Sequence, residues 1–315
     1  MADKSKPGDY FNRPEKLGAW VGFKQFLWNP ETKQFMGRTS SSWAKILIFY
    51  IIFYVILSAF FVALFLIFTS TLKDGRPKYE LKESLIGANP GLGFRPMPPE
   101  SNVESTLVWY EKQNTDYWVE ELDKFLKGFN PNDGISRIDC KKKKPEHGES
   151  CEINLNAFSP CTSERKFGYP EGRPCIFLKL NKIYNWLPEY YNKSSELNQG
   201  MPETLKSHIK SREGSKKDLN VVWVSCEGEN PADIENLGNS ISYYSLGSEQ
   251  GFLGNYFPFM NSDGYLQPLV AVQFSSVKTG VLINIECKAW SKNIAHDRSD
   301  RRGSVHFELM VDEPK

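Results

Sequence analysis

The stretch ILIFYIIFYVILSAFFVALFLIF, residues 46–68, decides the architecture of this chain. Its 23 residues include no charge, no proline and no glycine. As an α-helix it would span about 34 Å, against about 30 Å for the hydrocarbon core of a bilayer. We therefore predict one transmembrane helix over residues 45–70. A buried helix of a soluble domain and a cleavable signal peptide both fit poorly, because the apolar run is long and 45 residues precede it.

The regions on the two sides of this span differ in charge and in cysteine content. Residues 1–45 contain eight basic and four acidic side chains, which favours a cytoplasmic tail, although the immediate flanks of the span are nearly balanced. All the cysteines follow the span, as expected of an oxidising compartment, and they are Cys140, Cys151, Cys161, Cys175, Cys226 and Cys287. The single glycosylation sequon, at Asn192, also requires the lumenal side. We predict a single-pass type II plasma-membrane protein with a cytoplasmic tail over residues 1–44 and an extracellular C-terminus.

The C-terminal region reads mainly as β-structure. A stretch rich in proline and glycine predicts an extended stalk over residues 71–100, and residues 101–315 would form the folded domain. An amphipathic helix is predicted at about Asp116–Lys127. Alternating or continuous apolar runs predict strands at 175–180, 221–226, 269–274, 281–287 and 305–311. Together they predict an antiparallel β-sandwich with one flanking helix.

The six cysteines allow fifteen sets of three disulfides, and spacing alone leaves these open. Cys226 and Cys287 each end a predicted strand. A bond between them would close a loop of about 62 residues and could tie sheet to sheet, stabilising the domain by about 4 kcal/mol in the chain-entropy model.

The sequence contains no motif of a catalytic, metal or nucleotide site. Asp-x-Asp, His-Glu-x-x-His, Gly-x-Ser-x-Gly and phosphate-loop patterns are all missing. The four histidines are scattered and no Cys-x-x-Cys pair exists, so we predict no metal site and no cofactor. A net charge of +1 gives no reason to expect a nucleic-acid partner. The basic run 141–144 could bind anionic glycans but is more typical of a solvated turn.

Aromatic residues gather in three places. The tail carries Trp20, Phe23, Phe26, Leu27 and Trp28, which predicts a segment that packs on something or lies at the membrane interface. Within the span, residues 50, 54 and 58 form a polar-tipped stripe and residues 59 and 63 a small-residue stripe, as helix partners require. Residues 243–244, 252 and 256–259 predict exposed aromatic loops that bind protein, with ordinary core packing as the alternative.

Several longer motifs resemble the β subunit of the sodium/potassium-transporting ATPase over nearly the whole chain. FLWNP at 26–30, FMGRT at 35–39 and FYIIFY at 49–54 resemble its tail and membrane motifs. In the C-terminal region, FGY at 167–169, LKLN at 178–181, YLQPLVAVQF at 265–274 and IECKA at 285–289 resemble the others. Val55 stands where vertebrate members have glycine, and Tyr256-Phe257-Pro258-Phe259 stands where they have Tyr-Tyr-Pro-Tyr. The single sequon and a short first cysteine loop suggest an invertebrate member.

This resemblance implies an immunoglobulin-like sandwich and sequential pairing of the cysteines. It implies a noncatalytic subunit that helps the catalytic α subunit to fold and reach the cell surface and that tunes its potassium and sodium affinity. Tyr50, Phe53 and Tyr54 would pack on the seventh membrane helix of the α subunit, and Tyr256, Phe257, Pro258 and Phe259 would touch its loop between helices seven and eight. Membrane lipid and a small FXYD-type third subunit are further expected partners. A proton/potassium pump β subunit and a homophilic adhesion glycoprotein remain alternatives, with a type II ectoenzyme third.

Overall fold

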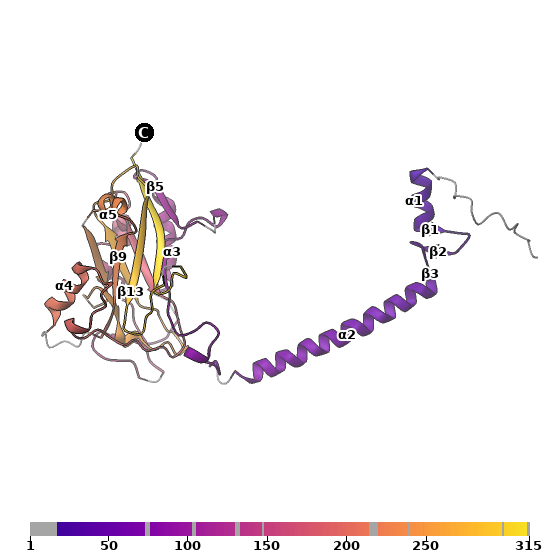
Figure 1. Cartoon of the computed structure of the whole chain (residues 1–315), viewed down its shortest axis with the longest axis horizontal. Helices are drawn as coiled ribbons and strands as arrows, with labels where there is room; N and C mark the ends of the chain where they lie inside the picture. Colours follow the sequence, from indigo (N-terminus) through magenta and orange to yellow (C-terminus); the bar gives the residue numbers. More distant parts are fainter. Residues whose placement is uncertain are drawn as a thin grey trace, which may run out of the picture. The chain divides into compact units, whose positions relative to one another are not determined.

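The computed structural model describes residues 18–72, 76–102, 105–129, 133–146, 148–213, 220–238, 240–247, 249–297 and 299–313. The chain divides into two compact units, with the boundary between residues 73 and 74. Figure 1 labels the main elements of both units.

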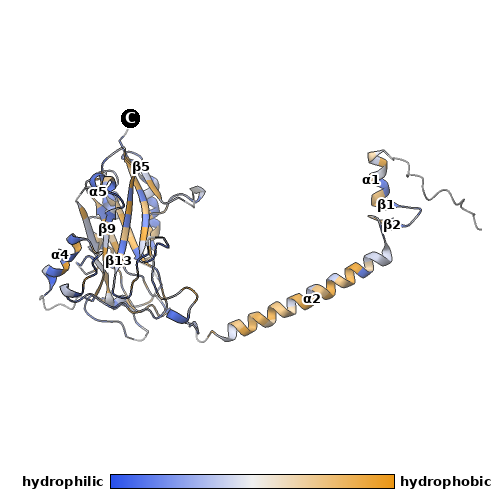
Figure 2. Cartoon of the chain, viewed as in Figure 1, coloured by the Kyte–Doolittle hydropathy of each residue, from blue (hydrophilic) through white to orange (hydrophobic). Residues whose placement is uncertain are grey.

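The N-terminal unit consists of two helices joined by a small antiparallel sheet. Its elements are α1 (Ala19–Leu27), β1 (Trp28–Asn29), β2 (Gln34–Phe35), β3 (Arg38–Thr39) and α2 (Ser40–Ser70). Among the described residues, only α2 is long and apolar enough to cross a membrane, and Figure 2 shows it hydrophobic along most of its length. It contains the predicted span and begins at Ser40, because residues 40–45 continue the helix into a polar first turn.

Two β-sheets form the C-terminal unit. The first has the strand order β10 (Ile241–Ser245), β12 (Leu269–Phe274), β8 (Cys175–Leu180) and β4 (Leu92–Arg95). The second has the order β11 (Gly251–Leu253), β9 (Val221–Gly228), β13 (Ile283–Trp290), β14 (Ser304–Asp312) and β5 (Leu107–Glu111). Neighbouring strands in these two sheets are antiparallel, except that β5 runs parallel to β14. The expected sandwich is confirmed, and the parallel edge pair is possible because no hairpin joins β5 to β14.

The two sheets meet through aromatic side chains. The ring of Phe307 on β14 lies 5.0 Å from that of Phe94 on β4 and 6.1 Å from that of Phe274 on β12, so one side chain contacts two strands of the opposite sheet. All three rings are buried. Such aromatic pairs contribute about 0.5–1.5 kcal/mol beyond the apolar area they bury.

Within the described residues, three α-helices flank the sandwich, where we predicted one. The predicted helix α3 (Asp116–Lys127) is confirmed, and it buries Trp118, Leu122 and Leu126. The unpredicted helices are α4 (Glu203–Arg212) and α5 (Pro231–Leu237). Helix α4 buries only Leu205 and Ile209, which pack in a cluster with the cross-strand tryptophans 223 and 290. Two apolar positions in ten residues give too weak a periodicity to predict a helix.

The remaining regular elements are short. Strands β6 (Arg137–Ile138) and β7 (Ser150–Cys151) form a separate parallel pair. The 3-10 helices are η2 (Leu81–Glu83), η3 (Glu100–Asn102), η4 (Leu155–Phe158), η5 (Ser163–Gly168), η6 (Ser194–Glu196) and η7 (Gly254–Tyr256).

The predicted stalk over residues 71–100 is too long. Strand β4 lies inside that range, pairs with β8 at the edge of the first sheet, and buries Leu92 and Phe94. Just before it, the Asn89 amide donates to the carbonyl of Ala295 (3.0 Å) and its oxygen accepts from the amide of the same residue (2.7 Å). An extended segment rich in proline and glycine can still serve as an edge strand, which needs partners on one side only.

Three disulfides join the cysteines in sequential order, as the resemblance implied. The pairs are Cys140–Cys151, Cys161–Cys175 and Cys226–Cys287. The third bond does not tie sheet to sheet, contrary to our prediction. Its cysteines lie directly opposite one another on β9 and β13 of one sheet, with their Cα atoms 4.0 Å apart. The sandwich is therefore held together across its two sheets by apolar packing rather than by this covalent bond.

We predict that removal of core volume at β14 weakens the fold far more than an equal change at the surface. Leu309 is fully buried, so Leu309→Ala should lower the free energy of unfolding by about 2–5 kcal/mol. Leu282→Ala, at an exposed leucine, should change it by less than about 0.5 kcal/mol. Urea unfolding of the detergent-solubilised chain measures both, and similar losses would contradict the packing described above.

Candidate partner-binding surfaces

Four aromatic rings form a continuous ladder on α2. The ring centroids of Tyr50 and Tyr54 are 6.2 Å apart, and those of Phe49 and Phe53 are also 6.2 Å apart, each pair stacked one helical turn apart. Edge contacts of 5.4 Å join the two pairs. All four rings are exposed in the isolated chain. The ladder is thus a ready-made, rigid aromatic face for a neighbouring helix.

Tyr54 brings a polar group deep into the span. It follows Ile46 by eight residues, which places it about 12 Å along the helix from the start of the apolar run. The hydrocarbon core is about 30 Å thick, so the backbone of Tyr54 lies near the middle of the membrane and its hydroxyl lies within the hydrocarbon. No described residue of the chain forms a hydrogen bond with this hydroxyl. An unsatisfied polar group in hydrocarbon is costly, so the position favours a partner that supplies a donor or an acceptor.

The prediction that the aromatic residues between 243 and 259 form exposed loops is wrong. Tyr243 and Tyr244 belong to β10 and are half-buried, whereas Phe252 and Tyr256 are buried in the core. The Tyr243 hydroxyl accepts from the backbone amide of Cys226 at 2.8 Å. These residues instead follow the alternative given above, ordinary core packing. The surrounding glycine and proline residues suggested loops, but Gly251 begins strand β11 and Gly254 begins the 3-10 helix η7.

The segment 256–259 is buried at its first two residues and half-buried at its last two. The Tyr256 hydroxyl donates to the carbonyl of Glu152 at 2.7 Å, and burial raises the pKa of this phenol. Phe257 is buried with its ring edge-on to that of Trp186 at 5.5 Å. Pro258 and Phe259 are half-buried and so offer the accessible part of this predicted contact.

A cation lies over the accessible end of this segment. The Lys182 ammonium is 5.2 Å from the ring centroid of Phe259 and 5.4 Å from that of Tyr265. Beside the segment is a cavity of about 560 Å³, whose lining includes Arg76, Lys144, Glu146 and Pro258. Aromatic surface next to charged groups of both signs is suited to a polar protein loop rather than to an apolar ligand.

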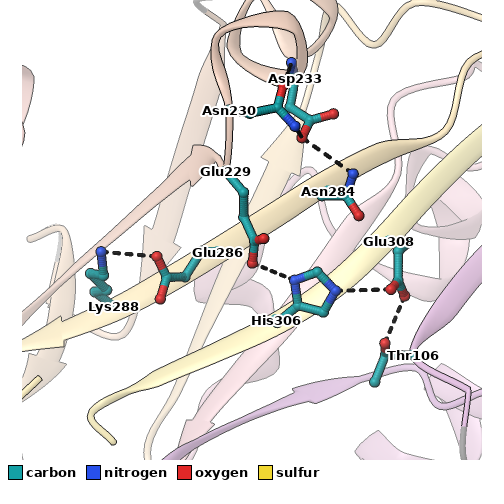
Figure 3. Close-up of polar contacts among 9 residues, drawn as sticks. All are labelled: Thr106, Glu229, Asn230, Asp233, Asn284, Glu286, Lys288, His306 and Glu308. Carbon is teal, nitrogen blue, oxygen red and sulfur yellow. Dashed lines mark hydrogen bonds and ion pairs between the residues drawn. The ribbon is translucent and has the colours of Figure 1, made fainter. Parts of the chain in front are cut away.

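A polar cluster crosses the second sheet. Figure 3 shows His306 of β14 between two carboxylates, with Nδ1 2.5 Å from Glu229 and Nε2 2.8 Å from Glu308. The imidazole ring therefore bridges the two carboxylates. The Thr106 hydroxyl donates to the second oxygen of Glu308 at 2.6 Å. This cluster joins the loop after β9 to β14 and to the segment that leads into β5.

These contacts alter the acidity of Glu308. Burial alone favours the neutral carboxyl, but the hydrogen bonds from Thr106 and His306 together outweigh it and lower the pKa of Glu308. A lowered pKa in the folded state means that the ionised carboxylate stabilises the fold, and this contribution is lost as the pH falls. The cluster therefore contributes to the stability of the domain.

The remaining sequence predictions fall at the surface of the C-terminal unit. Asn192 is exposed, as a glycan acceptor must be, and lysines 141–144 are exposed as well. No group of acidic, histidine or cysteine side chains suited to a metal ion is found within the described ranges. His208 and His296 are half-buried, whereas His147 lies outside the described residues.

The His306 cluster was not predicted from the sequence. We treated this histidine as scattered because no other histidine lies near it in sequence. The available signal was Glu308, two residues later on the same predicted strand, since residues i and i+2 lie on one face of a strand. The sequence could not have placed Glu229 in this cluster, because Glu229 follows a different strand.

Comparison with known proteins gives a consistent family. The model of the family described as "Sodium / potassium ATPase beta chain" matches residues 13–307. The chain is 46% identical to sodium/potassium-transporting ATPase subunit beta-2 of Drosophila melanogaster over 313 residues, 96% of each protein. It is 41% identical to subunit beta-1 of the same fly, with 98% of each covered. The human subunit beta-2 is 31% identical, with 92% of this chain and 93% of the human protein covered.

We predict a pH-dependent effect of Thr106→Val. Losing the hydroxyl should let the pKa of Glu308 rise and should cost about 1 kcal/mol of unfolding free energy near neutral pH. The cost should shrink as the pH falls from about 5 toward about 3, because Glu308 becomes protonated in both proteins. Chemical unfolding at several pH values across this range measures the loss of unfolding free energy. The control is Thr279→Val, whose exposed hydroxyl makes only a 3.4 Å contact with Glu313. An equal cost of Thr106→Val at every pH would count against the assignment.

Proposed function

The chain belongs to the sodium/potassium ATPase beta chain family, and on this premise we propose that it is the noncatalytic β subunit of a sodium/potassium-exchanging P-type ATPase. In this role it assists folding, membrane insertion and trafficking of the catalytic α subunit. It also modulates the affinity of the pump for potassium and sodium. The nucleotide and ion chemistry belongs to the α subunit.

The observation that carries this proposal is the ladder on α2 with the unpartnered hydroxyl of Tyr54. In a bilayer, helices associate through close packing and interhelical hydrogen bonds rather than through the hydrophobic effect. A stacked aromatic face that includes Tyr50 and Phe53 supplies the packing surface, and Tyr54 supplies the hydrogen bond. The partner in this proposal is a membrane helix of the α subunit.

A second contact involves the segment 256–259. Pro258 and Phe259, with Lys182 over the ring, face the loop that joins two membrane helices of the α subunit. The buried residues Tyr256 and Phe257 act by holding this segment in place. If the α subunit contacts these surfaces unequally in its transport states, the difference in contact energy shifts its ion affinity by the same amount.

The proposed orientation is type II in the plasma membrane, with the segment that precedes the span, residues 1–44, in the cytoplasm. Three disulfides in the C-terminal unit favour an oxidising compartment on that side. The excess of basic residues before the span favours the cytoplasm on the other side. Membrane lipid and a small FXYD-type third subunit complete the proposed environment.

The relatives favour a sodium/potassium pump over a proton/potassium pump, because their names refer to sodium and potassium. The homophilic adhesion hypothesis rested on exposed aromatic loops, and the burial of Phe252 and Tyr256 weakens that basis.

We predict that Tyr54→Phe weakens assembly by the loss of one hydroxyl. Co-expression with an α subunit, a mild-detergent pull-down and a ouabain-sensitive ATPase assay of the eluate measure assembly. A membrane hydrogen bond is worth about 1 kcal/mol, so the retained α subunit should fall about fivefold, and further with Tyr54→Ala. Ile52→Ala, on another side of α2, should have little effect. Failure of the wild-type chain to retain any ATPase subunit would sink the proposed function.

We predict that Asn192 carries a glycan at the surface of intact cells. Endoglycosidase treatment should increase the gel mobility of the wild-type chain and leave Asn192→Gln unchanged, because the exposed sequon faces the lumen in the proposed orientation. Protease added outside intact cells should also digest the C-terminal unit. A C-terminal unit that resists this protease, on a chain without a glycan, would reverse the orientation.

A further inference from the structure

The first helix of the N-terminal unit presents an uncovered apolar face. Residues Ala19, Trp20, Phe23, Phe26 and Leu27 share one side of α1, by their three- and four-residue spacing. Trp20 is 66% exposed and Phe26 is 52% exposed, and no residue of α1 is buried. Gln25 lies on the opposite side and Lys24 at the edge. A nine-residue helix with this pattern needs a covering surface to be stable in water.

Backbone and side-chain contacts tie this helix to the start of the membrane span. The amide of Met36 donates to the carbonyl of Leu27 at 3.1 Å, which fixes α1 to the small sheet. The indole of Trp43 in the first turn of α2 then donates to the carbonyl of Phe35 at 2.9 Å, and the two rings lie 6.3 Å apart. The apolar face of α1 is therefore held close to the N-terminal end of α2.

The position of Trp43 indicates how deep the segment from α1 to the start of α2 lies in the membrane. Trp43 lies three residues before Ile46, so it is about 4–5 Å along the helix from the edge of the apolar run. The headgroup layer of each leaflet is about 5–8 Å thick. Trp43 and Phe35 thus lie among lipid headgroups, where amphipathic aromatic rings are enriched.

The charged side chains before the span complement an anionic lipid surface. Between residues 18 and 45 there are four basic side chains, Lys24, Lys33, Arg38 and Lys45, and one acidic side chain, Glu31. The Lys24 ammonium lies 5.8 Å from the ring centroid of Trp20, at the edge of the apolar face. From there it can reach headgroups while its stem covers apolar surface.

We propose that residues 19–45 form a lipid-binding interfacial element, in which α1 lies in the plane of the leaflet with its apolar face among the acyl chains. Anionic phospholipid headgroups contact the basic side chains. An amphipathic helix of this type inserts its apolar face about 5–10 Å into the boundary between headgroups and acyl chains. This element needs no protein partner, and so the inference is independent of the proposed assembly with an ATPase.

The test uses the full chain alone in lipid nanodiscs, with about 30% phosphatidylserine in phosphatidylcholine, a content that gives an anionic surface. Spin labels are attached at Phe23→Cys and, as the matched control, at Gln25→Cys. The described cysteines are all in disulfides, so the new thiol is labelled selectively without reduction. Accessibility to oxygen and to a water-soluble nickel complex reports the depth of each label. We expect the label at position 23 to lie about 10 Å deeper than that at 25, the width of a helix.

Three other outcomes would overturn the proposal. Equal accessibility of both labels to the nickel complex would mean that α1 is surrounded by water. Protection of position 23 only after assembly with an α subunit would mean that protein covers this face. An unchanged depth in nanodiscs of phosphatidylcholine alone would remove the role of anionic headgroups.

Discussion

The hydrocarbon core of the membrane offers no hydrogen-bond partner to the backbone, and this constraint shapes the whole chain. A single span satisfies it only as one unbroken helix, and α2 extends from Ser40 to Ser70 without interruption. At its end, the hydroxyls of Thr69, Ser70 and Thr71 donate to carbonyls three residues earlier and so satisfy acceptors of the last turn. The segments before and after a single span meet different surroundings, and the cysteines all lie in the segment after it.

The C-terminal unit solves a separate problem, the joining of two sheets assembled from distant parts of the chain. Phe307 joins them by contact with Phe94 and Phe274, while each disulfide acts locally, within one sheet or at a loop. Packing therefore determines how the sheets meet, and the cysteines limit how far individual strands and loops can separate in the unfolded chain. The His306 cluster adds a polar link that joins three segments on the same sheet.

The span, α3 and the long strands could be predicted from the sequence, because their periodicity reports which face is buried. Strand β4 and helices α4 and α5 could not, because an edge strand needs few apolar residues and a short helix depends on what it packs against. The candidate contact residues likewise include some that the sequence predicts and some that it does not. The four-residue spacing of Tyr50 and Tyr54 predicts their stacked face, whereas the burial of Tyr256 depends on contacts with distant residues such as Glu152. The pairing of Cys226 with Cys287 within one sheet likewise requires the register of two strands.

Aromatic residues are buried in the C-terminal unit and exposed on α2, because water surrounds the first and lipid the second. In water an aromatic ring is most stable in a core, and the buried Phe252 and Phe257 obey this rule. In lipid the hydrophobic effect does not drive rings inward, so the exposed ladder on α2 costs nothing until a partner offers better packing. In each contact that we propose, a polar group therefore lies beside the aromatic rings. The Tyr54 hydroxyl has no hydrogen bond among the described residues, whereas Lys182 lies over the ring of Phe259 and Lys24 over that of Trp20.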